Sequence, residues 1–144
     1  MKDIEILKKV AAQELAAETR YAEQVSKLCD GKVKEVIAEL KDEEQRHKRE
    51  CAVIIKFHES GFDASSYDEA VDMELNSLQC VNMPDMIAFL ELDVEKELEA
   101  KKQYEGFAKD LKDERLSNML TNFRDDEAQH AEKLHALLND LKGE

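Results

Sequence analysis

The chain has 144 residues, of which 42% are hydrophobic and 38% charged, and its formal net charge is −13. A chain this acidic would be repelled by a phosphate backbone, so nucleic acid is not an expected partner. No run of about 18 apolar residues is present and the N-terminal residues are charged throughout, so neither a membrane span nor a signal peptide is expected. Four Gly, one Pro and no Trp favour a single all-helical domain.

The cysteines indicate a compartment. Cys29, Cys51 and Cys80 are odd in number and form no C-x-x-C pair. They are therefore expected to be reduced thiols in a cytoplasmic protein, and a metal site built from paired cysteines is excluded.

Helix start and stop signals predict two long helices in the first part of the chain. The first run of residues with helical apolar periodicity ends at residues 29–32, where Gly31 is the expected C-terminal stop. The second run extends from about residue 32 to 57 and ends near Gly61. Because the turn between them is short, these two helices should be antiparallel neighbours.

Two further helices are predicted after residue 83. Pro84 suits the first turn of the third helix, which extends to about residue 111. A weaker break at residues 112–116 precedes the fourth helix, which is again an antiparallel neighbour. The segment between the pairs, residues 62–83, can run back along a helix of about 39 Å, since extended chain covers about 3.3 Å per residue. A long crossover would make the second and third helices parallel, and Ser66–Glu69 fits a capping box for a short helix within it.

Each predicted helix carries a core-facing stripe that is apolar at both ends and polar in the middle. The four stripes, in chain order, are Leu7, Val10, Glu14, Ala17, Tyr21, Val25 and Leu28; Val33, Ile37, Leu40, Glu44, His47, Cys51 and Ile54; Leu90, Asp93, Glu97, Ala100, Tyr104, Phe107 and Leu111; and Leu116, Leu120, Phe123, Glu127, His130, Leu134, Leu137 and Leu141. Burying unpaired acids is costly, so something must compensate their charge.

The second half of the chain repeats the first half at an offset of 83 residues, without a gap. In each half a Glu is followed seven residues later by a Tyr, thirty residues later by a second Glu, and three residues beyond that by a His. The matched pairs are Glu14 and Glu97, Tyr21 and Tyr104, Glu44 and Glu127, and His47 and His130. This pattern indicates a duplicated helical hairpin, with repeats at about residues 3–58 and 85–141.

Packing two such hairpins about a pseudo-twofold axis predicts a metal centre. The residues that would meet at mid-bundle are Glu14, Glu44, His47, Glu97, Glu127 and His130. Two divalent cations would balance the four carboxylates, and this arrangement of Glu and Glu-x-x-His is the di-iron carboxylate pattern. Glu132 and His135 share the Glu-x-x-His spacing, but Lys102 stands thirty residues before Glu132, so this pair lacks the full pattern. The expected cofactor is a pair of iron ions, with manganese or zinc as alternatives.

At these residues the chain resembles the rubrerythrin-like branch of the ferritin superfamily. The segments that carry the resemblance are AAQELAAETRY, DEEQRH, ELEAKKQY and DDEAQH. The resemblance implies a ferritin-like four-helix bundle in which Glu44 and Glu127 bridge the metals. It also implies that Glu14 and Glu97 are terminal ligands and that each His completes one metal.

The resemblance implies a non-haem di-iron oxidoreductase that reduces peroxide or oxygen, although three features depart from the family. A complete rubrerythrin has a C-terminal rubredoxin domain, which this chain lacks, so electrons would come from a separate donor protein. Ala100 replaces an additional Glu of the peroxidase-type site, and Gln45 stands where bacterioferritin has a haem-binding Met, so haem is not expected. The alternatives are a ferroxidase or iron-storage protein using the same residues, and a metal-binding bundle without turnover. A homo-oligomer, most simply a dimer, is expected.

Several residues around the predicted site have expected supporting roles. Tyr21 and Tyr104 either donate hydrogen bonds to a site carboxylate or are ordinary core aromatics. Asp93 is expected to orient His47 or His130 through the free ring nitrogen. Glu18 borders the first stripe, where an additional ligand is one alternative, but its repeat partner is Lys101, so a solvated edge is expected. The remaining expectations are space over the metals at Ala17 and Ala100, a buried filler role for Cys51, and surface positions for His58 and His135.

Overall fold

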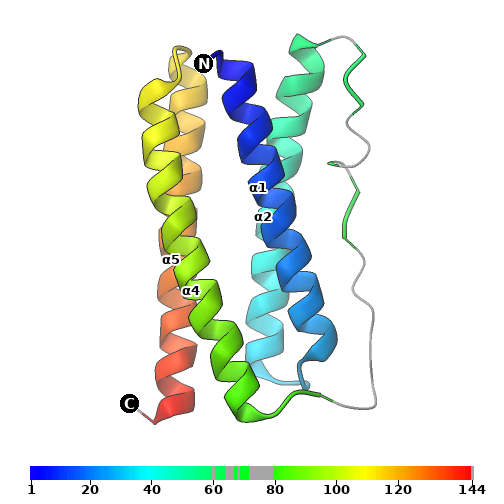
Figure 1. The fold of residues 1–144 in the computed structure, drawn as a ribbon, viewed down its shortest axis with the longest axis vertical. Helices are drawn as coiled ribbons and strands as arrows, with labels where there is room; N and C mark the ends of the chain where they lie inside the picture. Colours follow the sequence, from blue (N-terminus) through cyan, green and yellow to red (C-terminus); the bar gives the residue numbers. More distant parts are fainter. Residues whose placement is uncertain (60, 64–66, 68, 72–79, 144) are drawn as a thin grey trace.

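The computed structural model describes residues 1–59, 61–63, 67, 69–71 and 80–143. It contains four long helices and, within these residues, no strand: α1 (Asp3–Lys27), α2 (Lys32–His58), α4 (Met83–Asp110) and α5 (Glu114–Lys142). Figure 1 shows the four helices side by side along the long axis of the molecule. The prediction of an all-α four-helix bundle is confirmed.

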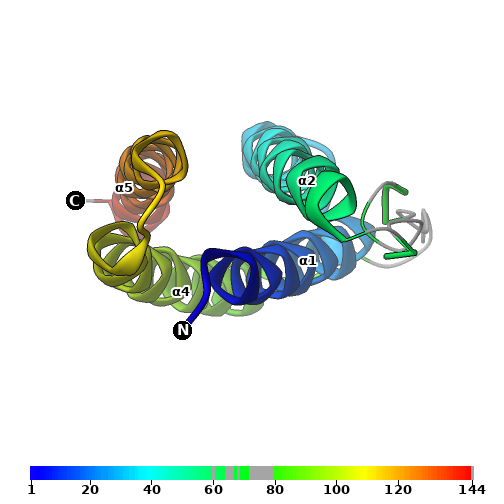
Figure 2. The same ribbon diagram turned by 90° about the horizontal axis from the view of Figure 1, so that it is seen from above.

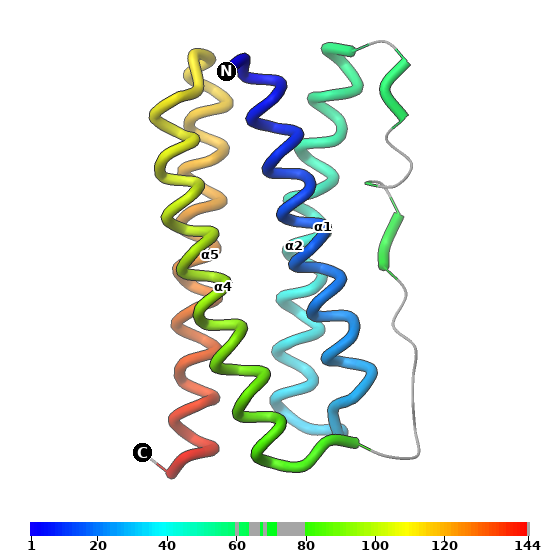
Figure 3. The backbone as a smooth tube through the Cα atoms, viewed as in Figure 1, coloured from blue at the N-terminus to red at the C-terminus, as the bar shows by residue number. Residues whose placement is uncertain are grey.

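The helices form two antiparallel hairpins, α1–α2 and α4–α5. The chain leaves α2 at one end of the bundle and enters α4 at the other, so α2 and α4 are parallel (Figure 3), as the predicted crossover requires. Viewed along the bundle, α1 and α4 lie in one layer and α2 and α5 lie in the other (Figure 2). The capping box predicted at Ser66–Glu69 includes Ser66 and Asp68, which lie outside the described residues.

The helix ends follow from local chemistry. The Asn82 side chain caps α4 by accepting a hydrogen bond from the Asp85 backbone N–H at 3.0 Å, and Pro84 lies in the first turn. Asp113 caps α5 in the same way, through the Arg115 N–H at 2.9 Å. Gly31, expected as the stop of the first helix, instead directly precedes α2 with φ of 150°, a conformation that favours glycine.

Apolar side chains form two clusters, one toward each end of the bundle. One cluster includes Leu7, Val10, Ile55, Leu120 and Phe123, and the other includes Val25, Leu28, Ile37, Leu40, Leu90, Leu134 and Leu137. Each fully buried Leu or Ile contributes about 1.5–3 kcal/mol to folding. The two clusters therefore hold the hairpins together on both sides of a polar centre, as the interrupted stripes predict.

A buried ion pair holds the crossover against the first hairpin. The Lys48 ammonium donates to Glu18 Oε1 at 2.5 Å and to the Glu69 carbonyl at 2.9 Å, and both ion-pair side chains are fully buried. The Val71 N–H donates to Glu18 Oε2 at 2.7 Å. The expected solvated position of Glu18 is therefore wrong. The comparison with Lys101 misled because the described crossover residues cover α1–α2, the hairpin that contains Glu18.

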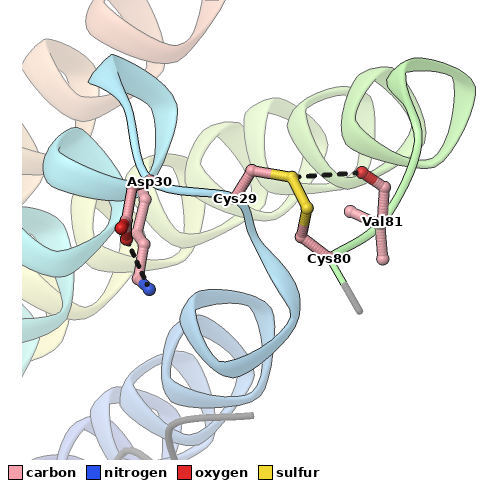
Figure 4. Close-up of a disulfide and its surroundings, with 5 residues drawn as sticks. Cys29, Asp30, Cys80 and Val81 are labelled. Atoms are coloured by element: carbon pink, nitrogen blue, oxygen red, sulfur yellow. Dashed lines mark hydrogen bonds and ion pairs between the residues drawn. A yellow bond between two sulfur atoms is a disulfide. The ribbon is translucent and has the colours of Figure 1, made fainter. Parts of the chain in front are cut away.

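Two of the cysteines form a disulfide, which corrects the expectation of three reduced thiols. Cys29, in the turn between α1 and α2, bonds to Cys80, and their Cα atoms are 4.9 Å apart (Figure 4). Beside the disulfide, the Val81 N–H donates to the Lys27 carbonyl at 2.8 Å. The crossover brings these residues together at one end of the bundle. Cys51 is free and buried, as predicted.

The sequence leads us to expect no membrane-spanning segment, and the helices of the structure can be compared with that expectation. Among the described residues, no helix has the length and the apolar content that crossing a bilayer requires.

Candidate metal centre

The six residues that the repeat predicts lie together at the centre of the bundle, and all six are buried. They form two groups, each with ligand atoms within 4.8 Å of one another: Glu14, Glu44, His47 and Glu127, and Glu44, Glu97, Glu127 and His130. Glu44 and Glu127 belong to both groups, as a pair of bridging carboxylates would. Each helix contributes to this cluster at mid-length, where its apolar stripe is interrupted.

The imidazole rings point their Nδ1 atoms at the carboxylates. His47 Nδ1 lies 3.4 Å from Glu14 Oε1 and 3.2 Å from Glu127 Oε1. His130 Nδ1 lies 2.9 Å from Glu44 Oε1 and 3.6 Å from Glu97 Oε2. In both cases one nitrogen and several oxygens converge on one point, which is the geometry that a metal ligand set needs.

The hydrogen bonding of the cluster tests whether a cation fits there. Each of the six residues has one buried atom with no hydrogen-bond partner among the described residues: Glu14 Oε2, Glu44 Oε1, His47 Nδ1, Glu97 Oε2, Glu127 Oε1 and His130 Nδ1. Buried polar atoms normally have partners, because an unsatisfied one costs about 1–3 kcal/mol. Carboxylate oxygens and imidazole nitrogens are all metal donors, so the residues present fit a pair of divalent cations.

Burial and crowding of the four glutamates change their pKa values. Burial raises the pKa of Glu14 to about 7. Burial and the neighbouring carboxylates raise the pKa of Glu44 and of Glu127 well above the usual range. Burial would also raise the pKa of Glu97, but its close contacts with Glu127 and His130 outweigh burial and lower this pKa. Without a cation, therefore, the four carboxylates do not all ionise at neutral pH.

The surroundings of His130 favour the protonated, charged form of its ring. Burial alone would lower its pKa, but the Glu44 and Glu97 carboxylates, 2.9 and 3.6 Å from Nδ1, outweigh burial and raise the pKa to about 11. The metal-free cluster therefore holds a cationic imidazole among acids. A bound metal would replace that proton on the ring, since a ligating His must be neutral.

Two acids outside the six orient the imidazoles. His47 Nε2 lies 2.9 Å from Asp126 Oδ2, and the same contact joins His130 Nε2 to Glu43 Oε2. Each contact crosses from one hairpin to the other, between α2 and α5. A carboxylate on Nε2 fixes the tautomer that leaves Nδ1 to bind a metal. Hydrogen bonding to His47 also lowers the pKa of Asp126.

The assignment of this role to Asp93 is wrong. Asp93 is buried, but its Oδ1 accepts from Arg20 Nε at 3.0 Å and from Gln24 Nε2 at 2.7 Å, both on α1. Its place on α4 directs it to α1, whereas the histidines are on α2 and α5. The signal for the correct acids was present in the repeat: Glu43 and Asp126 are 83 residues apart, and each directly precedes a Glu of the cluster.

Removing one of these acids should weaken metal binding without removing a ligand. We expect Asp126→Ala to lower the affinity for Zn²⁺ or Mn²⁺ by about 10–100-fold, because His47 loses the partner that orients its ring. Asp125→Ala is the matched control, since Asp125 pairs with Arg124 on the surface. Competition titrations against a fluorescent chelator measure the metal affinities of the two variants. Equal affinities for the two variants would contradict the assignment.

The tyrosines reach across the bundle to the cluster. Tyr104 Oη donates to Glu14 Oε1 at 2.7 Å, and Tyr21 Oη donates to Glu97 Oε1. Both rings are buried. The first of the two alternatives is therefore confirmed for both residues. Each tyrosine fixes an acid of the opposite hairpin, so the two bonds also tie the hairpins to each other.

A pocket of about 190 Å³ leads to the cluster between α1 and α4. Glu44, Glu97 and Glu127 line the pocket, and so do Ala17 and Ala100. The space expected at these two alanines is therefore present. Its polar lining also includes Gln13, Arg20, Lys96, Glu99 and Gln103. Small polar molecules thus have a route to the carboxylates from the α1–α4 face.

The fold and the cluster define a class: a four-helix bundle with a buried acid and histidine cluster that could bind metal. No family model and no curated protein matches the chain. Among solved structures, a hypothetical protein from Pyrococcus furiosus is similar, with a TM-score of 0.80 over 99% of this chain and 92% of that chain, at 19% sequence identity. This likeness supports the shared fold alone.

Proposed function

We propose that the chain is a non-haem di-metal oxidoreductase that reduces peroxide or oxygen at Glu14, Glu44, His47, Glu97, Glu127 and His130. One observation carries the proposal: two four-residue groups of metal-donor side chains share Glu44 and Glu127 at the buried centre. Paired metal positions with shared carboxylates suit two-electron chemistry better than a structural role, which needs only one ion. The sequence resemblance to rubrerythrin-like proteins supports the same assignment.

Iron is the proposed metal, with manganese and zinc as the alternatives that the donor set also accepts. Two bound iron ions would supply the redox chemistry, passing two electrons to the oxidant. Haem is not part of the proposal.

The residues of the chain have distinct roles in this function. The four carboxylates and two imidazoles hold the metals, and Asp126 and Glu43 fix the imidazole rings. Tyr104 and Tyr21 hold Glu14 and Glu97 in place through their hydroxyl groups. The pocket over Ala17 and Ala100, of about 190 Å³, has room for a molecule the size of peroxide.

Reduction of one peroxide consumes two electrons and two protons and yields two waters. We propose that a separate electron-donor protein supplies the electrons and that the present chain acts as a homodimer.

Two alternative functions use the same six residues. One is the oxidation of ferrous iron for storage, and the other is metal binding without turnover.

Stopped-flow oxidation separates these functions. Protein loaded anaerobically with two Fe²⁺ per chain is mixed with peroxide or oxygen, then reduced with dithionite and mixed again. The proposal predicts rapid oxidation, retention of both irons and full recovery over repeated cycles. Release of the iron, or uptake of many more than two irons per chain with oxygen, would favour the ferroxidase alternative. Absence of oxidation would leave only the metal-binding bundle.

Filling the pocket should slow oxidation without removing the metals. In Ala100→Leu the larger side chain occupies the route to Glu97 and Glu127, so we expect peroxide oxidation to slow by about tenfold or more. The stoichiometry should stay at two metals per chain. Ala88→Leu, at an exposed position of the same helix, is the control. An unchanged rate in Ala100→Leu would mean that the oxidant enters elsewhere.

A further inference from the structure

An apolar groove is lined by residues of α2 and α5. It lies at the end of the bundle where α2 ends and α5 begins; Figure 1 shows that these two helix ends are at the same end of the molecule. We call it the α2–α5 groove and define it by Val53, Ile54, Phe57, Leu116 and Met119. Two adjoining hollows of about 410 and 340 Å³ make up the groove, and both include Val53, Ile54 and Met119.

The groove exposes large apolar side chains beside its hollows. Phe57 is 89% exposed and Val53 is 57% exposed. A single exposed apolar residue needs no explanation, but a Phe and a Val beside a continuous apolar hollow are typical of a surface that binds a protein partner.

Basic groups surround the groove in an otherwise acidic chain. Arg46, Arg49 and Arg115 line its hollows together with two acids, Glu50 and Asp113. Three of the five arginines in the chain are therefore here, although the net charge of the chain is −13. The Asp113 carboxylate caps α5 and lies 3.9 Å from Arg115 Nε, so the three arginines outnumber the two acids and the groove wall has a net positive charge. Arginine beside exposed aromatic surface favours an acidic partner.

The groove is also connected to the candidate metal centre. Arg46 Nη2 lies 3.6 Å from Asp126 Oδ2, and that same oxygen lies 2.9 Å from His47 Nε2. Three side chains therefore lead from the groove wall to the cluster. The groove belongs to the α2–α5 layer, opposite the α1–α4 layer that contains the pocket (Figure 2). A partner on the groove would leave the pocket open to a small oxidant.

We propose that the α2–α5 groove docks an acidic one-electron carrier protein, of the iron–sulfur or flavin class, that supplies electrons to the centre. The inference rests on the proposed function. Each carrier molecule is oxidised by one electron, so two successive dockings supply the two electrons that one peroxide consumes. The apolar side chains of the groove provide contact area for the carrier. The three arginines, Arg46, Arg49 and Arg115, which we call the arginine rim, orient it.

Charge favours this occupant over a second copy of the chain. A twofold contact between two copies places the same patch on both sides. Because Arg46, Arg49 and Arg115 outnumber Glu50 and Asp113, two such patches would meet with net charges of the same sign. An acidic carrier instead meets the rim with opposite charge, which speeds encounter and makes binding sensitive to salt.

Binding to defined carriers tests the proposal independently of catalysis. The probes are an acidic [2Fe–2S] ferredoxin, a rubredoxin and a flavodoxin, each titrated calorimetrically against metal-free and metal-loaded protein at low and high salt. We expect at least one carrier to bind, and we expect Phe57→Glu and Arg115→Glu each to weaken that binding about tenfold or more. The matched controls on α4 are Leu98→Glu and Lys102→Glu, at exposed positions, and they should change it little.

The outcomes separate this inference from the proposed function. Reduction of the oxidised metal centre by the bound carrier should fall in Phe57→Glu and Arg115→Glu, whereas reduction by dithionite should not change. Loss of peroxide chemistry with dithionite would overturn the proposed function while leaving the binding result to stand. No binding by any of the three carriers, or equal weakening by the α4 controls, would overturn the docking surface. So would sedimentation data in which Phe57→Glu disrupts a dimer without affecting carrier binding.

Discussion

Replacing Glu127 by alanine should strip metal from both positions of the centre. Glu127 belongs to both ligand groups, so its carboxylate has no substitute at either one. We expect the two metals per chain to fall to nearly none after dialysis against a weak chelator, with affinity lowered by about 100-fold or more at each position. Metal analysis after dialysis measures the stoichiometry.

Two further variants test which acids are ligands. Glu97 belongs to one group only, so Glu97→Ala should empty one position and leave about one metal per chain. Glu132 has the same spacing to His135 as Glu127 has to His130, but it is exposed, so Glu132→Ala should retain both metals. Equal loss in Glu127→Ala and Glu132→Ala would show that the repeat identifies the wrong acids.

Metal-free protein should become less stable as the pH rises from about 5 to 7. Burial raises the pKa of Glu14 from 4.5 to about 7, and the pKa values of Glu44 and Glu127 are also raised. A group with a raised folded pKa stabilises the fold fully below its unfolded pKa and loses that contribution as the pH rises through the folded value. For Glu14 alone the loss is on the order of 3 kcal/mol, which corresponds to about 10 °C in Tm.

Burial also raises the pKa of Asp93, to about 6, so this residue adds to the same decline. The remaining shifted groups act mostly outside the interval from pH 5 to 7. Glu97 and Asp126 have lowered pKa values, so their contribution is present above their unfolded values and is lost only toward acid pH. His130 has a pKa raised to about 11, so its contribution also declines with rising pH, beginning above its unfolded value of about 6.5. Between pH 5 and 7 the raised carboxylates therefore dominate.

Thermal melts of the two forms from pH 4 to 8 check this prediction. The metal-loaded protein should instead lose stability toward acid pH, where protons compete with the metals for Glu and His. Glu44→Gln is a matched variant, because an amide resembles a protonated carboxyl and should flatten the slope of the metal-free protein. Parallel curves for the two forms, with no gap at pH 7, would contradict a buried metal centre.

The repeat is the reason that the fold and the six-residue cluster could be predicted. Because Glu14, Glu44 and His47 recur 83 residues later, one hairpin determines the other, and the interrupted stripes show where the polar centre lies. Glu43 and Asp126 are also 83 residues apart, so the repeat predicts them equally well. The position of Asp93 on its stripe does not show which helix its carboxylate faces, and this is why the expectation for Asp93 is wrong.

The features that could not be predicted all involve the crossover. Cys29 pairs with Cys80 and Glu18 pairs with Lys48 because the crossover lies against the first hairpin. The two repeats cover residues 3–58 and 85–141, and the crossover lies between them, so the repeat carries no information about it. Helical periodicity is equally uninformative there, because the contacts are formed by irregular chain and single side chains.

Anomalous diffraction from crystals of metal-loaded protein would show whether the six buried residues bind metal. We expect two metal ions about 3–4 Å apart, both bound by Glu44 and Glu127. One ion would also be bound by Glu14 and His47, and the other by Glu97 and His130. Metal peaks confined to surface acids, with the six buried side chains bonded only to one another, would contradict this expectation.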